Sequence, residues 1–263
     1  MKMMDAAIAA AIIAAFFALI STIISLLGQS RTKKLEHLFL KERETESKEA
    51  KLIEIVTKYR NPILRAAIDL KRRLVYYIQE EGLSTDYRKS TKDREYIINN
   101  TIFLIAEYFC WVEILRREVQ FLDFGQIESN RKFTQLLREI SWAFMRGMND
   151  HSDFVLFRIY NGEQRAIGEI MIKSSTESNK HGYECIGYAE FVMKLEEKEF
   201  GKWLLKLKND LEKNAKAPHK GDKRLILIHD AFIDLINFLD PEFSGCPKEE
   251  REKLQQEKTA LNP

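Results

Sequence analysis

The sequence predicts a mainly α-helical protein with a single N-terminal transmembrane helix, a cytosolic helical bundle and at most one β-hairpin. Three observations lead to this fold class. Residues 6–27 form an apolar run without charge, and apolar residues then recur at helical spacing along most of the chain. One short stretch is instead rich in aromatic and β-branched residues and ends at Asn161-Gly162, a dipeptide typical of tight hairpins.

The apolar run predicts a membrane anchor over residues 1–28. As a helix the run is about 30 Å long, which matches the hydrocarbon thickness of a bilayer. A cleaved signal peptide has an apolar stretch of only about 7–15 residues, so the length favours an uncleaved anchor. Arg31, Lys33 and Lys34 follow the run. Because such cations stay near cytoplasmic lipid head groups, we expect a single-pass protein of the cell (inner) membrane, with its N-terminus outside and its bulk cytoplasmic.

Small residues form a ridge along the same predicted helix, at Ala6, Ala10, Ala14, Ala18 and Thr22. Such a ridge lets two helices approach closely in lipid, where backbone packing drives association. The spacing therefore predicts a homo-oligomer held together by this segment. The alternative is that the ridge is a by-product of an alanine-rich composition.

Composition limits the partners of the remaining chain. The 42 basic and 40 acidic residues of the whole chain nearly cancel, which argues against binding to duplex DNA. The cysteines, Cys110, Cys185 and Cys246, are widely spaced and predict neither a disulfide framework nor a zinc site, in agreement with a reducing cytosol. The sequence has no phosphate-binding glycine loop and no zinc-protease motif, so we expect neither a metal nor a cofactor.

The chain after the anchor has three parts that differ in composition. Residues 29–60 are largely polar and predict a solvated helical stalk. Asn61-Pro62 is expected to end the stalk and to begin a helical domain over residues 61–246, because Asn is a good N-cap and proline favours the first helical position. Residues 247–263 predict a loose polar tail. Within the domain we expect a polar loop over residues 84–90 and helices over residues 62–81, 92–122, 131–148, 189–214 and 225–239. The helix over residues 189–214 is expected to be interrupted near residues 197–201.

The helix expected over residues 92–122 begins at Ser90-x-x-Asp93, a spacing typical of a capping box. It is apolar nearly all round, which predicts the central core helix, whereas its polar residues argue against a second membrane span. Glu107 is one of these polar residues. A carboxylate with such neighbours must be paired or have a raised pKa, so it is either an ion-pair partner or a catalytic acid. We favour the ion pair, with Arg65, Arg72, Arg73, Arg116 and Arg117 as candidate partners.

Two readings are open for residues 154–172. Residues 154–160 have strand composition, and Asn161-Gly162 would then pair them with residues 166–172 in a hairpin. A helix is the alternative, because one helix face would contain Ala166, Ile167, Ile170 and Met171. We predict the hairpin, and the fold is mainly α in either case.

Pairs of arginine and histidine have the spacing of a known active-site motif. Arg146 precedes His151 with four residues between them, and Arg31 precedes His37 with five. This spacing resembles the motif of HEPN-type ribonucleases, small helical domains that act as dimers without a metal. The resemblance implies that Arg146 steadies the scissile phosphate of RNA, and that His151 handles the proton of the attacking ribose hydroxyl.

A further pair, Arg224 and His229, lies on the apolar helix expected over residues 225–239, and there we expect a structural histidine. The HEPN family usually places Asn, Asp or His directly after the arginine. Gly147 and Leu225 stand at that position here.

A broader resemblance covers residues 59–240. The stretches that begin at Tyr59 (YRNPILRAAIDL), Ile105 (IAEYFCWVEILRREVQFLDFG) and Gln164 (QRAIGE) are similar to segments of membrane-anchored microbial proteins without a known activity. This resemblance implies a shared folded domain. We therefore expect a membrane-tethered helical module that acts as an oligomeric scaffold, sensor or membrane effector. The alternative is a membrane-anchored HEPN-like ribonuclease of a defence or toxin system, with RNA as its partner.

Overall fold

The computed structural model describes residues 38–44, 46–47, 50–51, 53–55, 57–118, 128–146, 156–173, 183–217 and 222–254. The chain divides into two compact units, Met1–Lys51 and Leu52–Pro263. In the first unit, the described residues between 38 and 51 are helical and exposed. The predicted anchor, its small-residue ridge and the cations Arg31, Lys33 and Lys34 lie outside the described residues.

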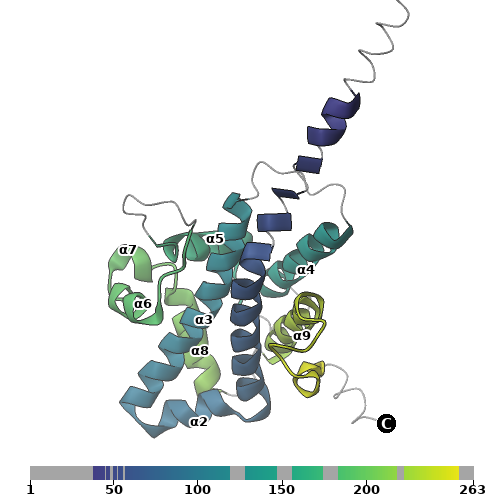
Figure 1. Ribbon diagram of the computed structural model, residues 1–263. Helices are drawn as coiled ribbons and strands as arrows, with labels where there is room; N and C mark the ends of the chain where they lie inside the picture. The colour runs from purple at the N-terminus through teal and green to yellow at the C-terminus, as the bar shows by residue number, and fades with distance from the viewer. Residues whose placement is uncertain are drawn as a thin grey trace, which may run out of the picture. The chain divides into compact units, whose positions relative to one another are not determined.

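The second unit is a bundle of helices in its described part, which confirms the mainly α fold class (Figure 1). Its first helix spans residues 57–79. Within the described residues, β structure is limited to one isolated antiparallel bridge between Ile172 and Cys185. The further helices are α2 (Gly82–Lys89), α3 (Thr91–Glu118), α4 (Glu128–Met145), α5 (Asn161–Ile170), α6 (Tyr188–Lys194), α7 (Lys198–Gly201), α8 (Leu205–Lys216), α9 (Asp222–Leu239) and the 3-10 helix η1 (Lys248–Arg251).

Helix α3 is the core helix, and it contacts α2, α5, α6 and α8. Ser90 caps its start as predicted, because the Asp93 N–H donates to Ser90 Oγ over 3.1 Å. Among the described residues, α3 is the one helix that is long and apolar enough to cross a membrane by length and composition. The core helix of a water-soluble domain passes the same test, and 72% of the apolar window of α3 is buried inside the protein.

The prediction that Asn61-Pro62 separates two helices is wrong, because one helix continues through this dipeptide from residue 57 to residue 79. Long-range contacts hold the turn before the proline. Tyr59 is buried and donates to Glu118 Oε1 over 2.9 Å, and Arg60 Nε donates to the main-chain oxygen of Leu239 over 2.7 Å. These contacts outweigh the preference of a residue before proline for extended backbone.

Residues 82–89 form α2, so the polar loop predicted over residues 84–90 is also wrong. Glu81 has a left-handed backbone with a φ of 49°, and it separates the 57–79 helix from α2. Leu83 and Tyr87 lie one helical turn apart, and both are buried. This apolar pair packs α2 against α3 and α8.

The predicted hairpin is wrong within the described residues, and the helical alternative is right for its second half. Asn161-Gly162 begins α5 and makes no β-turn. The cause is a capping interaction, in which the Tyr160 N–H donates to Glu163 Oε2 over 2.8 Å. Gly168 then lets α5 approach α3 closely, because a Cβ there would lie 2.5 Å from the main-chain oxygen of Phe109.

The last third of the bundle follows the predicted pattern more closely. Helix α6 ends at Lys194 and α8 begins at Leu205, so the chain is broken around the predicted positions, with the short α7 between them. Helix α9 packs against α4. It ends at Leu239, directly before Asp240-Pro241, as expected for the residue before a proline.

The chain after α9 was predicted to become a loose tail at residue 247, and this is wrong for residues 247–254. Arg251 and Leu254 are buried, and η1 spans residues 248–251. We call residues 240–254 the C-terminal segment. Ion pairs and hydrogen bonds to distant helices hold this segment in place. The balanced charge of residues 247–263 in the sequence does not indicate such contacts.

Candidate functional site

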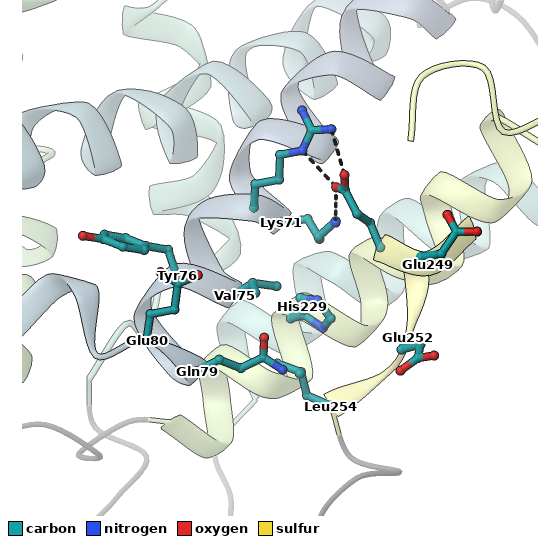
Figure 2. A pocket seen from close by; sticks show the side chains of 11 residues that line it. Lys71, Val75, Tyr76, Gln79, Glu80, His229, Glu249, Glu252 and Leu254 are labelled. Carbon is teal, nitrogen blue, oxygen red and sulfur yellow. Dashed lines mark hydrogen bonds and ion pairs between the residues drawn. The ribbon is translucent and has the colours of Figure 1, made fainter. Parts of the chain in front are cut away.

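A cavity of about 460 Å³ lies between the 57–79 helix, α9 and the C-terminal segment (Figure 2). Its wall contains side chains of both charges, together with an imidazole. This mixture suits a small polar ligand better than an apolar one. The lining residues are Lys71, Arg72, Val75, Tyr76, Gln79, Glu80, His229, Glu249, Glu250, Glu252 and Leu254.

Lys71 is the most unusual residue of this wall, because its side chain is only 3% exposed. It lies on the inward face of the 57–79 helix, one position after the core residue Leu70. Its ammonium Nζ is 3.1 Å from Glu250 Oε2. A buried lysine needs such a partner, since an isolated charge in the interior is costly.

Glu250 also receives the neighbouring guanidinium. Arg72 Nε lies 3.0 Å from Glu250 Oε2, and Arg72 Nη2 lies 3.4 Å from Oε1. The hydrogen bond from Arg72 lowers the pKa of Glu250 despite the opposing effect of burial, and Lys71 adds to the lowering. One carboxylate of the C-terminal segment thus neutralises two cations of the 57–79 helix.

His229 comes from α9 and is 1% exposed. Its Nδ1 is 2.9 Å from Asp230 Oδ1, and the Leu254 N–H donates to that same oxygen over 2.9 Å. With Asp230 as a carboxylate acceptor, the hydrogen-bond network assigns the proton to Nδ1 and leaves Nε2 as the free acceptor nitrogen of the ring. The carboxylate therefore orients an imidazole in the wall of the cavity.

A buried ion pair fixes the backbone of the C-terminal segment beside the cavity. Arg251 Nη2 lies 2.6 Å from Asp240 Oδ2, and Arg251 Nη1 donates to the main-chain oxygen of Asp240 over 2.8 Å. Asp240 also accepts hydrogen bonds from the backbone of Ser244, Gly245 and Cys246. Burial alone would raise the pKa of Asp240, but the hydrogen bonds from Ser244, Gly245 and Cys246 hold it well below its usual range.

The structure places only one member of the predicted pair Arg146 and His151. Arg146 is exposed directly after α4, and its main-chain oxygen accepts a hydrogen bond from Arg224 Nη2 over 2.8 Å. His151 lies outside the described residues, as do Arg31 and His37. The proposed contact between Arg146 and His151 therefore stays a prediction.

In the pair of Arg224 and His229, the arginine has a structural role. Arg224 is 1% exposed, and its Nη1 donates to the main-chain oxygens of Ala143 and Phe144, both over 2.9 Å. These carbonyls belong to the last turn of α4, where a helix leaves acceptors unsatisfied. Arg224 therefore caps α4 and has no guanidinium face open to a substrate phosphate.

The ion pair predicted for Glu107 belongs to another glutamate of α3. Glu113 is 2% exposed and pairs with Arg116 Nη2 over 2.6 Å and with Arg117 Nε over 2.9 Å. Glu107 is half-buried and has no ion-pair partner among the described residues. Burial, followed by the charge of Asp69, raises its pKa to about 7.

Sequence reasoning also missed Lys71 and Glu250. Their contact joins residues 179 positions apart, and each looks like a solvent-exposed charge in its own segment. Within the part of the chain that the structure describes, no group of three or more His, Cys, Asp or Glu side chains could hold a metal ion. Comparison of the chain with protein-family models, curated proteins and solved structures found no match.

Proposed function

We propose that this protein is a membrane-tethered helical module that senses a small anion, such as phosphate or a small carboxylate, in the cavity beside Lys71. The observation that carries the proposal is the buried Lys71 ammonium, whose partner Glu250 is 39% exposed. A cation fixed in a bundle helix and neutralised by a surface side chain can exchange that side chain for a ligand of the same charge.

The geometry of the cavity supports this exchange. Lys71 and Arg72 both bind the Glu250 carboxylate, so they offer an anion a point charge and a forked donor together. The buried pair of Asp240 and Arg251 holds the neighbouring backbone, and therefore only the Glu250 side chain has to rotate away. The incoming anion takes the place of the Glu250 carboxylate, so Lys71 keeps a counter-charge throughout, and the released Glu250 side chain is exposed enough to be solvated.

The test is calorimetric titration of the full chain in detergent with inorganic phosphate and with succinate. Glu250→Gln removes the competing charge and should tighten binding by about three- to tenfold. Lys71→Met keeps the alkyl stem and should abolish binding. Glu249→Gln is the matched control, since Glu249 lines the same cavity but is not a partner of either cation.

Two results would contradict the proposal. One is that neither probe binds to the wild type or to Glu250→Gln. The other is that Lys71→Met binds as well as the wild type while keeping the wild-type thermal unfolding midpoint, which shows that it is folded.

The membrane part of the proposal is supported by residues 6–27 and by Arg31, Lys33 and Lys34. We propose a single-pass anchor with an outside N-terminus and a cytoplasmic bundle. The chain should sediment with membranes, resist extraction at alkaline pH, and be shielded from protease added to whole cells. Recovery of the intact chain in the high-speed supernatant would contradict the anchor.

We propose further that the ridge from Ala6 to Thr22 makes the protein a homo-oligomer. Ala10→Ile together with Ala14→Ile should fill the close contact between the helices and reduce the size of the detergent-extracted particle. Ala9→Ile lies off the ridge and should leave the size unchanged. A wild-type protein that is already monomeric would contradict this part alone.

An HEPN-like ribonuclease is the alternative, and it is favoured by the exposed position of Arg146 at the end of α4. Under this alternative, Arg146→Ala and His151→Ala each abolish cleavage of a labelled single-stranded RNA. Arg138→Ala, an exposed arginine of the same helix, should retain it. Equal activity of all three variants would exclude these two residues as the catalytic pair.

A further inference from the structure

The wall of the cavity beside Lys71 contains more negative than positive side chains. Its two cations are Lys71 and Arg72, and its four carboxylates are those of Glu80, Glu249, Glu250 and Glu252. A dianion such as phosphate or succinate therefore enters a cavity whose own charge is already negative. A ligand that also brings a positive charge complements this wall better.

Three of the four carboxylates are not needed to neutralise the two cations. Glu250 receives both cations, Lys71 over 3.1 Å and Arg72 over 3.0 Å. The other three carboxylates are exposed and form no ion pair with any described residue: Glu80, Glu249 and Glu252. Each ionised carboxylate has two oxygens that can accept hydrogen bonds from a bound ligand.

The buried imidazole of His229 adds a neutral acceptor to the same wall. His229 is 1% exposed, and its Nδ1 is held by Asp230 over 2.9 Å, which leaves Nε2 to accept a hydrogen bond. In the view of Figure 2, this imidazole lies between Glu80 and Glu252. The wall thus combines a pair of cations with a group of hydrogen-bond acceptors, and most of these acceptors are charged.

The size of the cavity allows a ligand to reach both sets of groups. Cavities of roughly 300–1,000 Å³ hold ligands as large as drugs, and this one has a volume of about 460 Å³. A single phosphate or carboxylate group would fill only part of it. The remaining space can therefore hold a second group of the same ligand, next to the acceptors.

We propose that the ligand of this cavity is a zwitterion, a small acid that also carries an ammonium group, such as a free amino acid. Its carboxylate takes the place of Glu250 on Lys71 and Arg72. Its ammonium group has three N–H donors and binds the unpaired carboxylates together with Nε2 of His229. This ligand class rests on the proposed function, because it belongs to the same cavity.

The experiment is calorimetric titration of the full chain in detergent with succinate, L-malate and L-aspartate. The three acids share one carbon chain with two carboxylates, and they differ in one substituent, which is hydrogen, hydroxyl or ammonium. Aspartate should bind about three- to tenfold more tightly than succinate, as expected for a few ion pairs with exposed carboxylates. Malate should stay close to succinate, because a hydroxyl group brings no charge.

Substitutions in the wall test where the ammonium group binds. Glu80→Gln together with Glu252→Gln should remove most of the preference for aspartate over succinate, and both residues are exposed, so the fold should be kept. Glu242→Gln is the matched control, because Glu242 is an exposed residue of the C-terminal segment that does not line the cavity. This control should keep the preference. Lys71→Met should abolish the binding of aspartate as well as that of succinate.

Different results would contradict the proposed function and the ligand class. If none of the three acids binds, both are wrong. If succinate or malate binds as tightly as aspartate, the zwitterion is wrong while the anion site stands. The zwitterion is also wrong if the double variant keeps the full preference, or if Lys71→Met binds aspartate as well as the wild type does.

Discussion

Glu107 and Glu113 lie on the same helix, α3, and only Glu113 has arginine partners. Glu113 stabilises the fold through Arg116 and Arg117. Glu107, less than two turns earlier, is half-buried and has no counterion among the described residues. We therefore expect a Glu→Gln substitution to change the free energy of unfolding in opposite directions at the two positions.

Glu107→Gln should stabilise the protein at pH 8. The pKa of Glu107 is raised to about 7, so the folded state disfavours the ionised form at higher pH. This cost is present in full above pH 7, decreases as the pH falls, and vanishes below the unfolded pKa, where both states are protonated. We expect a gain of roughly 1–2 kcal/mol in the free energy of unfolding at pH 8 and almost none at pH 4, by urea unfolding of the detergent-solubilised protein.

Glu113→Gln is the matched comparison and should destabilise the protein by about 1–3 kcal/mol at pH 8, because its two arginines lose their buried carboxylate. A loss of stability in both variants would show that Glu107 is paired in solution.

Acid should weaken the protein through Asp240. The pKa of Asp240 is lowered in the folded state. Its contribution to the free energy of unfolding is therefore present above its pKa in the unfolded chain, and it is lost as the pH falls through its pKa in the folded protein. The free energy of unfolding should therefore decrease steadily below about pH 4. Asp240→Asn should be less stable than the wild type at pH 7 but should change less with acid. Asp234→Asn, which removes a half-exposed pair with Lys253, is the matched control for the loss of a carboxylate.

Gly168→Ala should loosen the contact between α3 and α5. The new Cβ would meet the Phe109 oxygen at 2.5 Å and Glu113 Cβ at 2.9 Å, so one helix has to shift. We expect a loss of about 1–3 kcal/mol by thermal or urea unfolding. Gly162→Ala lies in the first turn of the same helix with nothing within 4 Å of its Cβ, and it should be neutral or stabilising by up to about 1 kcal/mol. Equal effects of the two substitutions would contradict the close approach.

Arg251→Ala should destabilise the protein by about 3–5 kcal/mol, because it leaves the Asp240 carboxylate buried without its cation. Lys253→Ala, two residues later, removes a half-exposed pair with Asp234 and should cost about 1 kcal/mol or less. Denaturant unfolding of both variants checks the prediction. A small effect of Arg251→Ala would mean that the C-terminal segment is not held through Asp240.

Local patterns in the sequence predicted part of this fold well. The apolar periodicity of α3, its Ser90 cap and the end of α9 before Pro241 all depend on neighbouring residues, and the structure agrees with them. Predictions based on local preference failed where tertiary contacts outweigh it. Pro62 sits within a helix because Tyr59 and Arg60 have distant partners.

The cavity could not be predicted from the sequence for the same reason. Lys71 and Glu250 each lie in a charged stretch, and only the packing of the C-terminal segment against the 57–79 helix shows that they are partners. The burial of His229 could be expected, because it lies on the apolar helix α9.

The C-terminal segment packs against the 57–79 helix and the end of α9, so the protein can finish folding only after this segment has been synthesised. Lys71 and Arg72 are synthesised early. Their partner Glu250, and Arg251, which pairs with Asp240 directly after α9, are synthesised much later. Before residue 250 is synthesised, Lys71 lacks its carboxylate partner. We therefore expect a chain truncated before residue 250 to fold incompletely.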